Sequence, residues 1–339
     1  MIKKHLSPLW VITSYYNPQG YQRRRQNFLA FKKNLNLPLM VVELAEEGRH
    51  QLNENSADRV IRLTGDSFIW QKERLLNIAI EHLPAHVKYV AWVDCDMKFE
   101  RDDWADEAVS KLEKNGGLVQ LFGKVIHCPQ AFNPLKDSIS SIENLHLFTE
   151  RSSGMIAAQG DYQLKTGVFS RVKTPPPDAG DVIIETVGHA WAACVSDLSK
   201  VKIYDANIIG GGDSIMFSCA VGVIDGYLKK RDYTEKHQEH IHVWQKNASE
   251  HGLFRQVDYV GGNLYHYWHG DFKHRRYNQR IEILKSFDYD PETDLCLASN
   301  GTWAWANPHG GLADSVRRYF LSRCEDGLHE ACSSDAISS

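Results

Sequence analysis

The sequence predicts an α/β protein in which a mixed, mainly parallel sheet is covered by helices, with a loop-rich insertion and a C-terminal extension. Short apolar runs alternate with amphipathic stretches through the first half of the 339 residues, which is the pattern of βαβ units. A hydrophobic fraction of 42% is enough for a large core. No Gly/Ser-rich linker divides the chain, so we expect one main domain over residues 1–285 and an extension over residues 286–339 packed on it, with frayed last residues.

The early elements follow from the spacing of the apolar residues. Four apolar runs, at residues 9–13, 39–42, 60–63 and 89–93, predict strands. Helical spacing predicts one helix at about residues 21–35 and a second at about residues 70–83, before Pro84. A third helix is expected to begin near Asp102, as a cap, and to end at the Asn-Gly-Gly of residues 115–117.

The alternation weakens beyond residue 117. Prolines between about residues 128 and 180 predict a loop-rich insertion. Regular structure is expected again at residues 183–185, in a helix opened by residues 210–213, and in a strand at residues 262–266. A basic helix at about residues 273–284 follows, and the tail after about Cys324 is expected to fray.

The composition excludes several classes of protein. A net charge of -4 and a pI near 6.5 give no overall attraction to nucleic acid or to an anionic membrane. No apolar run approaches the roughly 18 residues of a membrane helix, and the N-terminus is unlike a secretory signal. Seven cysteines without a C-x-x-C pair indicate reduced thiols. We therefore expect a soluble, cytoplasmic protein without a transmembrane segment, whose oligomeric state the sequence does not define.

The most informative segment is Asp94-Cys95-Asp96, which directly follows an apolar strand. Residues two apart in an extended chain point to the same side, so both carboxylates are expected to face one ligand. Ligands of open α/β sheets bind at the carboxyl ends of the strands. Two hard oxygen donors suit Mg²⁺ or Mn²⁺, which bridge to phosphate oxygens. The alternative is an acidic strand end without a metal.

Two later segments carry further candidates. Three glycines precede Asp213 and an apolar helix, so Asp213 is either a helix N-cap or a general base that takes a proton from a hydroxyl group. His266 and His269 lie at a predicted strand end, before a basic stretch. A histidine would complete a metal site and the cations would neutralise a diphosphate, whereas the alternative is that both histidines are structural or solvated.

In this order, the segments resemble the GT-A nucleotide-diphospho-sugar glycosyltransferases, particularly the bacterial and phage family-two-like enzymes, over about residues 8 to 285. Residues 11–17, VITSYYN, look like their first nucleotide-binding strand and loop, and residues 72–77, KERLLN, are similar to the helix before the metal strand. Gly211-Gly212-Asp213 resembles the Gly-Gly-Glu-Asp region of inverting enzymes such as β-1,4-galactosyltransferases. Because one of that acidic pair is a glycine in this chain, only Asp213 takes the role of base.

The resemblance implies transfer of a sugar from a nucleotide-diphosphate donor, with a UDP-sugar favoured, to an acceptor hydroxyl with inversion. It implies a GT-A fold and Mn²⁺ or Mg²⁺ held by Asp94, Asp96 and a histidine, His269 being slightly favoured over His266. Asp213 is assigned to catalysis, and Trp191, Gly211 and Gly212 to the acceptor. The residues assigned to the donor are Thr13, Tyr15, Asp66, Lys72, Asn77, Asp94 and Lys273.

Two other functions fit parts of the pattern. A nucleotidyltransferase that makes an activated sugar usually has a glycine-rich basic loop after the first strand, where this chain has TSYYNP at residues 13–18. A non-catalytic glycan-binding module would not need Asp94, Asp96 and Asp213 together. A glycan, a lipid-linked glycan, a protein and modified DNA are all open as acceptors, although the pI disfavours DNA.

Overall fold

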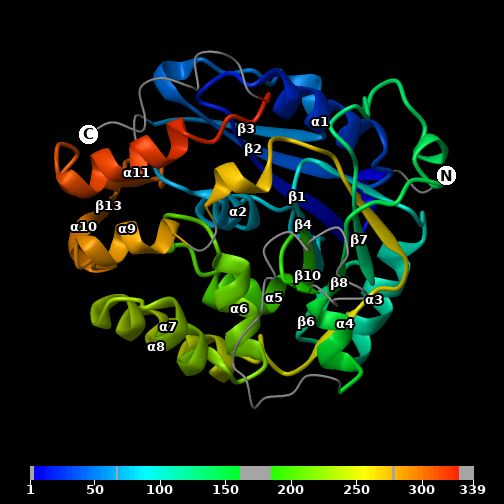
Figure 1. The fold of residues 1–339 in the computed structure, drawn as a ribbon. Helices are drawn as coiled ribbons and strands as arrows, with labels where there is room; N and C mark the ends of the chain where they lie inside the picture. The colour runs from blue at the N-terminus through cyan, green and yellow to red at the C-terminus, as the bar shows by residue number, and fades with distance from the viewer. Residues whose placement is uncertain (1–3, 66–67, 161–184, 277–278, 328–339) are drawn as a thin grey trace.

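The computed structural model describes residues 4–65, 68–160, 185–276 and 279–327, and its largest sheet has seven strands in the order β11-β6-β10-β4-β1-β2-β3 (Figure 1). The strands are β1 Leu9–Tyr16, β2 Leu39–Ala45, β3 Arg59–Thr64, β4 Tyr89–Val93, β6 Leu118–Gln120, β10 Ala190–Cys194 and β11 Val257–Tyr259. Strands β1 to β4 pair in parallel, as do β6 and β11, whereas β10 runs antiparallel to β4 and β6. The predicted α/β class with a mixed, mainly parallel sheet is confirmed.

Helices cover both faces of the large sheet. Leu9 and Val11 of β1 pack in one core with the helices α1 and α3, and the intervening Trp10 and Ile12 pack in another with α2, α5, α6 and α8. This alternation explains why the central strand β4, YVAWV, is apolar along its whole length. The helices are α1 Gln22–Lys33, α2 Lys72–Glu81, α3 Trp104–Asn115, α5 Val195–Val201, α6 Gly212–Ala220, α7 Ile224–Arg231 and α8 Glu235–Glu250.

The start of α3 differs from the prediction. The helix begins at Trp104, and its N-cap is Asp103, which makes no side-chain cap hydrogen bond. The carboxylate of Asp103 instead accepts two hydrogen bonds, each 2.9 Å long, from the guanidinium of Arg101. The predicted cap at Asp102 is therefore wrong, because α3 starts later and an arginine takes the nearby carboxylate.

A second sheet of five strands begins directly after the Asp-Cys-Asp segment. Its order is β5-β12-β7-β8-β9, and its strands are β5 Met97–Phe99, β12 Asn263–His266, β7 Lys124–His127, β8 Thr149–Ser152 and β9 Glu185–Thr186. The last residue of β12, His266, pairs with Met97 of β5 and with His127 of β7. This register brings residues far apart in the sequence beside Asp96.

The second sheet corrects only part of the predicted loop-rich insertion. Residues 128–148 are irregular as predicted, apart from the 3₁₀ turn η4 Ile139–Ser141. Strand β8 and helix α4 (Ser153–Ala158) fall within the span expected to be irregular. Both elements are short, and β8 is recognisable mainly by its pairing with β7. Residues 161–180 of the insertion, and the order expected at residues 183–184, lie outside the described residues.

The C-terminal elements pack around a third core with Phe68 and Ile208. Figure 1 shows α9, α10 and α11 grouped beside one end of the large sheet. The predicted basic helix is divided into a 3₁₀ turn, η5, and the separate helix α9, with residues 277–278 outside the described chain. The bounds are η5 Phe272–Arg275, α9 Arg280–Ser286, α10 Pro291–Asp294, β13 Leu295–Leu297, β14 Trp303–Trp305 and α11 Gly311–Leu321.

The residues after α11 are held more firmly than the sequence predicts. Glu325 is only 3% exposed, and its carboxylate lies 2.6 Å from Arg24 Nη2 and 3.0 Å from Arg323 Nη2. The prediction that the chain frays after about Cys324 is therefore wrong for the residues up to Gly327, because these two cations hold the segment in place. Among the described residues, none of the helices is long and apolar enough to cross a membrane.

A buried amide network fixes α2 to the segment before α6 and yields a stability test. The side-chain amide of Asn77 donates to Ile203 O at 2.8 Å and to Asp205 Oδ2 at 2.9 Å, and its carbonyl accepts from Ile203 N at 2.8 Å. We expect Asn77→Ala to lower the free energy of unfolding by about 1–3 kcal/mol, because the buried peptide groups of Ile203 lose their partner. The exposed control Asn55→Ala should change it by less than about 0.5 kcal/mol in urea denaturation. Equal losses for the two variants would contradict this account.

Candidate functional site

Three predicted site residues meet at the carboxyl end of β4. Lys72 opens α2, and its Nζ lies 2.8 Å from Asp94 Oδ1 and 2.9 Å from Asp213 Oδ2. The three side chains are 14%, 30% and 16% exposed, respectively. One ammonium group thus bridges a carboxylate that follows β4 and a carboxylate from α6.

Charge and burial act in opposite directions on this triad. Burial alone would lower the pKa of Lys72, but Asp213 and Asp94 raise it well above its usual value, so Lys72 stays charged. Burial raises the pKa of Asp94, and the nearby Lys72 offsets part of that effect. The ammonium group is what allows two carboxylates to be held together away from bulk water.

Asp213 reaches this position because of the glycine turn before it. Gly210 and Gly211 have φ values of 81° and 105°, a region that side chains with a Cβ rarely adopt. Gly211 is the N-cap of α6 and makes no side-chain cap hydrogen bond, and Asp213 is the second residue of the helix. The carboxylate of Asp213 pairs with Lys72, so it does not play the capping role that was its alternative interpretation.

A buried acid lies underneath the same turn. Glu73 is 3% exposed, and its Oε2 accepts a hydrogen bond of 3.2 Å from Trp70 Nε1. A Cβ added to Gly212 would lie 2.6 Å from Glu73 Oε1, so the helix start needs a glycine there. Burial raises the pKa of Glu73 to about 8, despite the opposing charge of Lys72. Glu73 is therefore mostly protonated at neutral pH.

Asp96 points to a different group of side chains, because residues 95 and 96 form a turn and not an extended strand. Its Oδ2 lies 3.0 Å from His269 Nε2, and its Oδ1 lies 3.8 Å from His266 Nε2. The two Nε2 atoms are 3.0 Å apart. The expectation that Asp94 and Asp96 face the same ligand is therefore corrected: Asp96 joins both histidines, and Asp94 lies against Lys72.

The group formed by Asp96, His266 and His269 fits a divalent metal ion. One ligand atom from each residue lies within 4.8 Å of the others. Asp96 Oδ1 is buried and has no hydrogen-bond partner among the described residues, which is what a carboxylate oxygen that binds a cation would show in the absence of the ion. A carboxylate with two imidazole nitrogens is a donor set used by divalent transition metals.

Cations already surround this group. Burial would raise the pKa of Asp96, but His269, Arg24 and Arg275 together lower it, so the carboxylate is ionised. Arg275 Nη2 lies 2.7 Å from His269 Nε2. An ion bound by both histidines would therefore require Arg275 to move away from that nitrogen.

Three further residues adjoin the metal group, and sequence reasoning missed them. His127 Nε2 lies 2.8 Å from Glu150 Oε2, which in turn lies 4.0 Å from His189 Nε2. His189 has a φ of 79°, a strained value for a residue with a Cβ, and its Nδ1 lies 4.0 Å from Asp94 Oδ2. His127 Nδ1 lies 2.9 Å from His266 Nδ1. The one available sequence signal is that His127, like His266, ends a short apolar run.

Burial and hydrogen bonding together determine the protonation of Glu150, His127 and His266. Burial would raise the pKa of Glu150, but hydrogen bonds from His127 and His189 lower that pKa to about 2. Burial lowers the pKa of His127 and lowers that of His266 well below its usual value. Glu150 is therefore a carboxylate beside a neutral imidazole, that of His127.

Several residues assigned to ligands are instead structural. Trp191 is fully buried, and its indole donates to Val187 O at 2.8 Å, so it has no surface for an acceptor. Asn77 is also fully buried, and its side-chain amide is hydrogen-bonded to the backbone of residue 203 and to Asp205. Tyr15 is 1% exposed within the core, and its hydroxyl donates to Gln51. We correct these three assignments, because buried side chains with satisfied polar groups cannot contact a ligand.

The other assigned donor residues are placed as follows. Thr13 is 1% exposed, and its hydroxyl donates to Val93 O at 2.7 Å, so it braces the strand before Asp94. This position corrects its assignment to the donor, because the hydroxyl is buried and already bonded. Lys273 lies within η5. Asp66 lies outside the described residues.

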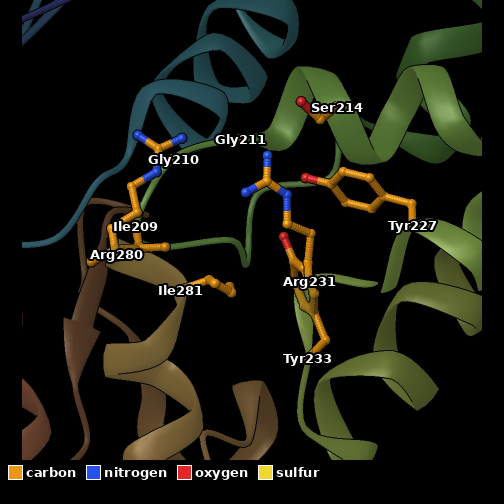
Figure 2. A pocket seen from close by; sticks show the side chains of 9 residues that line it. All are labelled: Ile209, Gly210, Gly211, Ser214, Tyr227, Arg231, Tyr233, Arg280 and Ile281. Atoms are coloured by element: carbon orange, nitrogen blue, oxygen red, sulfur yellow. The ribbon is translucent and has the colours of Figure 1, made fainter. Parts of the chain in front are cut away.

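A pocket borders the glycine turn, and Figure 2 shows its side chains converging from α6, α7, α9 and the adjoining loops. Arg280 packs on the turn, since a Cβ added to Gly210 would lie 3.0 Å from its Nη1. The described residues that line the pocket supply two guanidinium groups, three hydroxyl groups and no carboxylate, which suits an anionic ligand group. The lining residues are Ile209, Gly210, Gly211, Ser214, Tyr227, Arg231, Tyr233, Arg280 and Ile281.

No protein-family model matches the chain, and no curated protein matches it. Among solved structures, it is similar to TarS of S. aureus, with 11% identity and a TM-score of 0.35 over 81% of the chain and 39% of TarS. It is similar to the mannosyltransferase PcManGT from Pyrobaculum calidifontis in complex with GDP-Man and Mn²⁺, with 19% identity and a TM-score of 0.24 over 33% of the chain and 34% of that protein.

A third similar structure is the 4-diphosphocytidyl-2C-methyl-D-erythritolsynthase from Anaerococcus prevotii. The identity is 9% and the TM-score 0.31, over 77% of the chain and 90% of that protein. The chain spans less than half the length of the first two structures. With TM-scores this low, these likenesses assign neither a fold family nor an activity to the chain.

The contact between Gly212 and Glu73 predicts a steric requirement at the start of α6. We expect Gly212→Ala to lower the free energy of unfolding by about 1–3 kcal/mol, because the new Cβ would overlap the buried carboxyl group of Glu73. Gly188→Ala is a matched control, since the nearest atom to its new Cβ is Asp213 Oδ2 at 3.7 Å, an ordinary contact. Thermal denaturation compares the two variants, and equal stability would disprove the steric requirement.

Proposed function

We propose that this chain is a metal-dependent glycosyltransferase of the GT-A type that transfers a sugar from a nucleotide-diphosphate donor, preferably a UDP-sugar, to an acceptor hydroxyl with inversion. The observation that carries the proposal is the meeting of two groups after β4. One is a metal group of Asp96, His266 and His269, and the other is the carboxylate pair Asp94 and Asp213 bridged by Lys72. Such a site combines a place for a cation beside a diphosphate with a candidate base.

Asp96, His266 and His269 would hold the metal ion. When bound, the ion stabilises the negative charge that develops on the departing diphosphate. Two imidazole nitrogens favour Mn²⁺ over Mg²⁺, because Mg²⁺ prefers oxygen ligands. Lys72 supplies a second positive charge beside the same strand end, and its bridge orients Asp94 for the donor.

Asp213 is the proposed general base. The acceptor oxygen attacks the anomeric carbon, the bond from that carbon to the diphosphate oxygen breaks, and the hydroxyl proton passes to Asp213. Its contact with Lys72 fixes the direction of the carboxylate. Because the base acts across the sugar from the leaving group, the product has the opposite anomeric configuration.

The pocket beside Gly211 is the proposed acceptor site. Its lining includes Gly211 and Ser214, which lie on either side of Asp213 in the sequence. Arg231 and Arg280 favour an acceptor that carries a phosphate or carboxylate group. A crystal complex whose acceptor lies outside this pocket would refute the assignment.

Cytoplasmic location stays a prediction from the sequence.

The metal site is tested by thermal stabilisation. MnCl₂ with UDP should stabilise the wild type through binding to the folded state, by about 2.7 kcal/mol at a concentration one hundred times the dissociation constant. Asp96→Asn should remove the dependence on Mn²⁺, because the carboxylate charge that faces both histidines is lost. Stabilisation by UDP that is indifferent to EDTA and to Asp96→Asn would rule out the metal model.

A screen of UDP- and GDP-sugars then identifies the donor, and release of pyrophosphate instead of a nucleoside diphosphate would indicate a nucleotidyltransferase.

The base assignment is tested by Asp213→Asn. This variant keeps the shape of the side chain and should leave the affinity for donor and Mn²⁺ close to that of the wild type. Turnover should fall by roughly 10²–10⁴-fold, which is the usual contribution of a general base. Near-wild-type turnover, or a product that retains the anomeric configuration of the donor, would remove Asp213 from the mechanism.

A further inference from the structure

A continuous series of contacts leads from β8 to the metal group. Glu150 Oε2 lies 2.8 Å from His127 Nε2, His127 Nδ1 lies 2.9 Å from His266 Nδ1, and His266 Nε2 lies 3.8 Å from Asp96 Oδ1. The side chains of Glu150 and His127 are only 12% and 10% exposed. Both nitrogens of His127 are therefore engaged by protein groups, in a place where water has little access.

The hydrogen-bonding chemistry of these groups determines which ring nitrogen of each histidine carries the proton. A carboxylate only accepts hydrogen bonds, so His127 donates to Glu150 through Nε2–H. A neutral imidazole has a single N–H, which leaves Nδ1 of His127 as an acceptor. His266 must then donate to it through Nδ1–H, and Nε2 of His266 is left with its lone pair, 3.0 Å from His269 Nε2. That lone pair faces Asp96 and His269, as metal binding requires.

We propose that Glu150 and His127 are positioning residues that hold His266 in its Nδ1–H tautomer, so that Nε2 is available to the metal ion. This inference rests on the metal site of the proposed function. Neither residue has an assigned role in the donor, acceptor or base sites. His127 acts on the ion through His266, since His127 Nδ1 contacts the ring nitrogen that faces away from Asp96.

Two substitutions of His127 separate this role from simple packing. His127→Phe keeps a ring between Phe148 and Phe272, whose centroids lie 4.9 Å and 5.3 Å from that of His127, but it removes both hydrogen bonds. His127→Gln loses the ring, yet its amide can accept from His266 and donate to Glu150 in the same order. We expect Mn²⁺ affinity, measured by titration with MnCl₂ alone, to fall about 10- to 100-fold in His127→Phe and less than about tenfold in His127→Gln.

A second variant and a control accompany these measurements. Glu150→Ala should also weaken Mn²⁺ binding, because His127 then has no fixed acceptor and can present the wrong tautomer to His266. The control is His237→Phe, another buried histidine ringed by aromatic side chains, on α8 and outside this series of contacts. Its affinity for Mn²⁺ should equal that of the wild type.

Several outcomes would overturn the proposal. Wild-type affinity in His127→Phe would do so, and so would an equal loss in His127→Gln, since packing would then explain the result. Two Mn²⁺ ions per chain, with one lost in Glu150→Ala, would instead make His127, Glu150 and His189 a second metal site.

A measurement on the metal-free protein separates this inference from the proposed function. Long-range ¹H–¹⁵N correlation spectra of protein labelled at histidine should show His266 protonated at Nδ1 in the wild type and altered in His127→Phe. The His266→Gln variant identifies its signals. Absence of Mn²⁺ binding with an Nδ1–H His266 would refute the metal-dependent function and retain the hydrogen-bond order. An Nε2–H His266 would refute the positioning role whatever the protein binds.

Discussion

The site depends on how the backbone of Asp94-Cys95-Asp96 passes from one sheet to the other. Asp94 N donates to His189 O at 2.8 Å, beside β10 of the large sheet, and Asp96 O accepts from Tyr267 N at 2.8 Å, just after β12 of the second sheet. Cys95 between them is buried. Because the segment is held at both ends and turns in the middle, its two carboxylates point to different partners, and one short segment serves both a lysine bridge and a metal group.

The sequence predicts β1, β2 and β4 of the large sheet well because these strands are buried on nearly every residue. It also predicts the more exposed β3, whereas it misses β6, β10 and β11. Continuous apolar runs such as Tyr89–Val93 are a strong local signal, and the turn chemistry of Gly210 and Gly211 is equally local. The second sheet is different, because its short strands are partly exposed and pair across long separations, as His127 does with His266. Apolar periodicity cannot reveal such pairing, so Glu150, His127 and His189 were missed.

The same limit explains the incorrect ligand assignments. Strand and helix position are readable from the pattern, but whether a polar residue faces the ligand or the core is not. Thr13, Asn77 and Trp191 all lie close in sequence or in space to the strand end, yet each is buried with its polar atoms bonded to the protein backbone. In contrast, Lys72 and Asp213 are charged, and burying either side chain alone would cost free energy. They therefore form an ion pair, and a pairing of this kind can be expected from the residue types in the sequence.

Helix α2 carries Lys72 and Glu73 next to the turn and thereby sets the geometry of the proposed base. Adjacent helical residues point about 100° apart, so Lys72 reaches Asp94 and Asp213 while Glu73 lies beneath Gly212. Asn77 anchors the same helix to the segment that leads to α6. Removing one partner of a buried ion pair typically costs about 3–5 kcal/mol, so the lysine bridge is tied to the fold as well as to the chemistry. Three contacts of α2 therefore fix the position of Asp213: Lys72 with Asp213 itself, Glu73 with Gly212, and Asn77 with Ile203. Because these contacts act on the same helix start, the glycine turn, the lysine and the buried acid occur together.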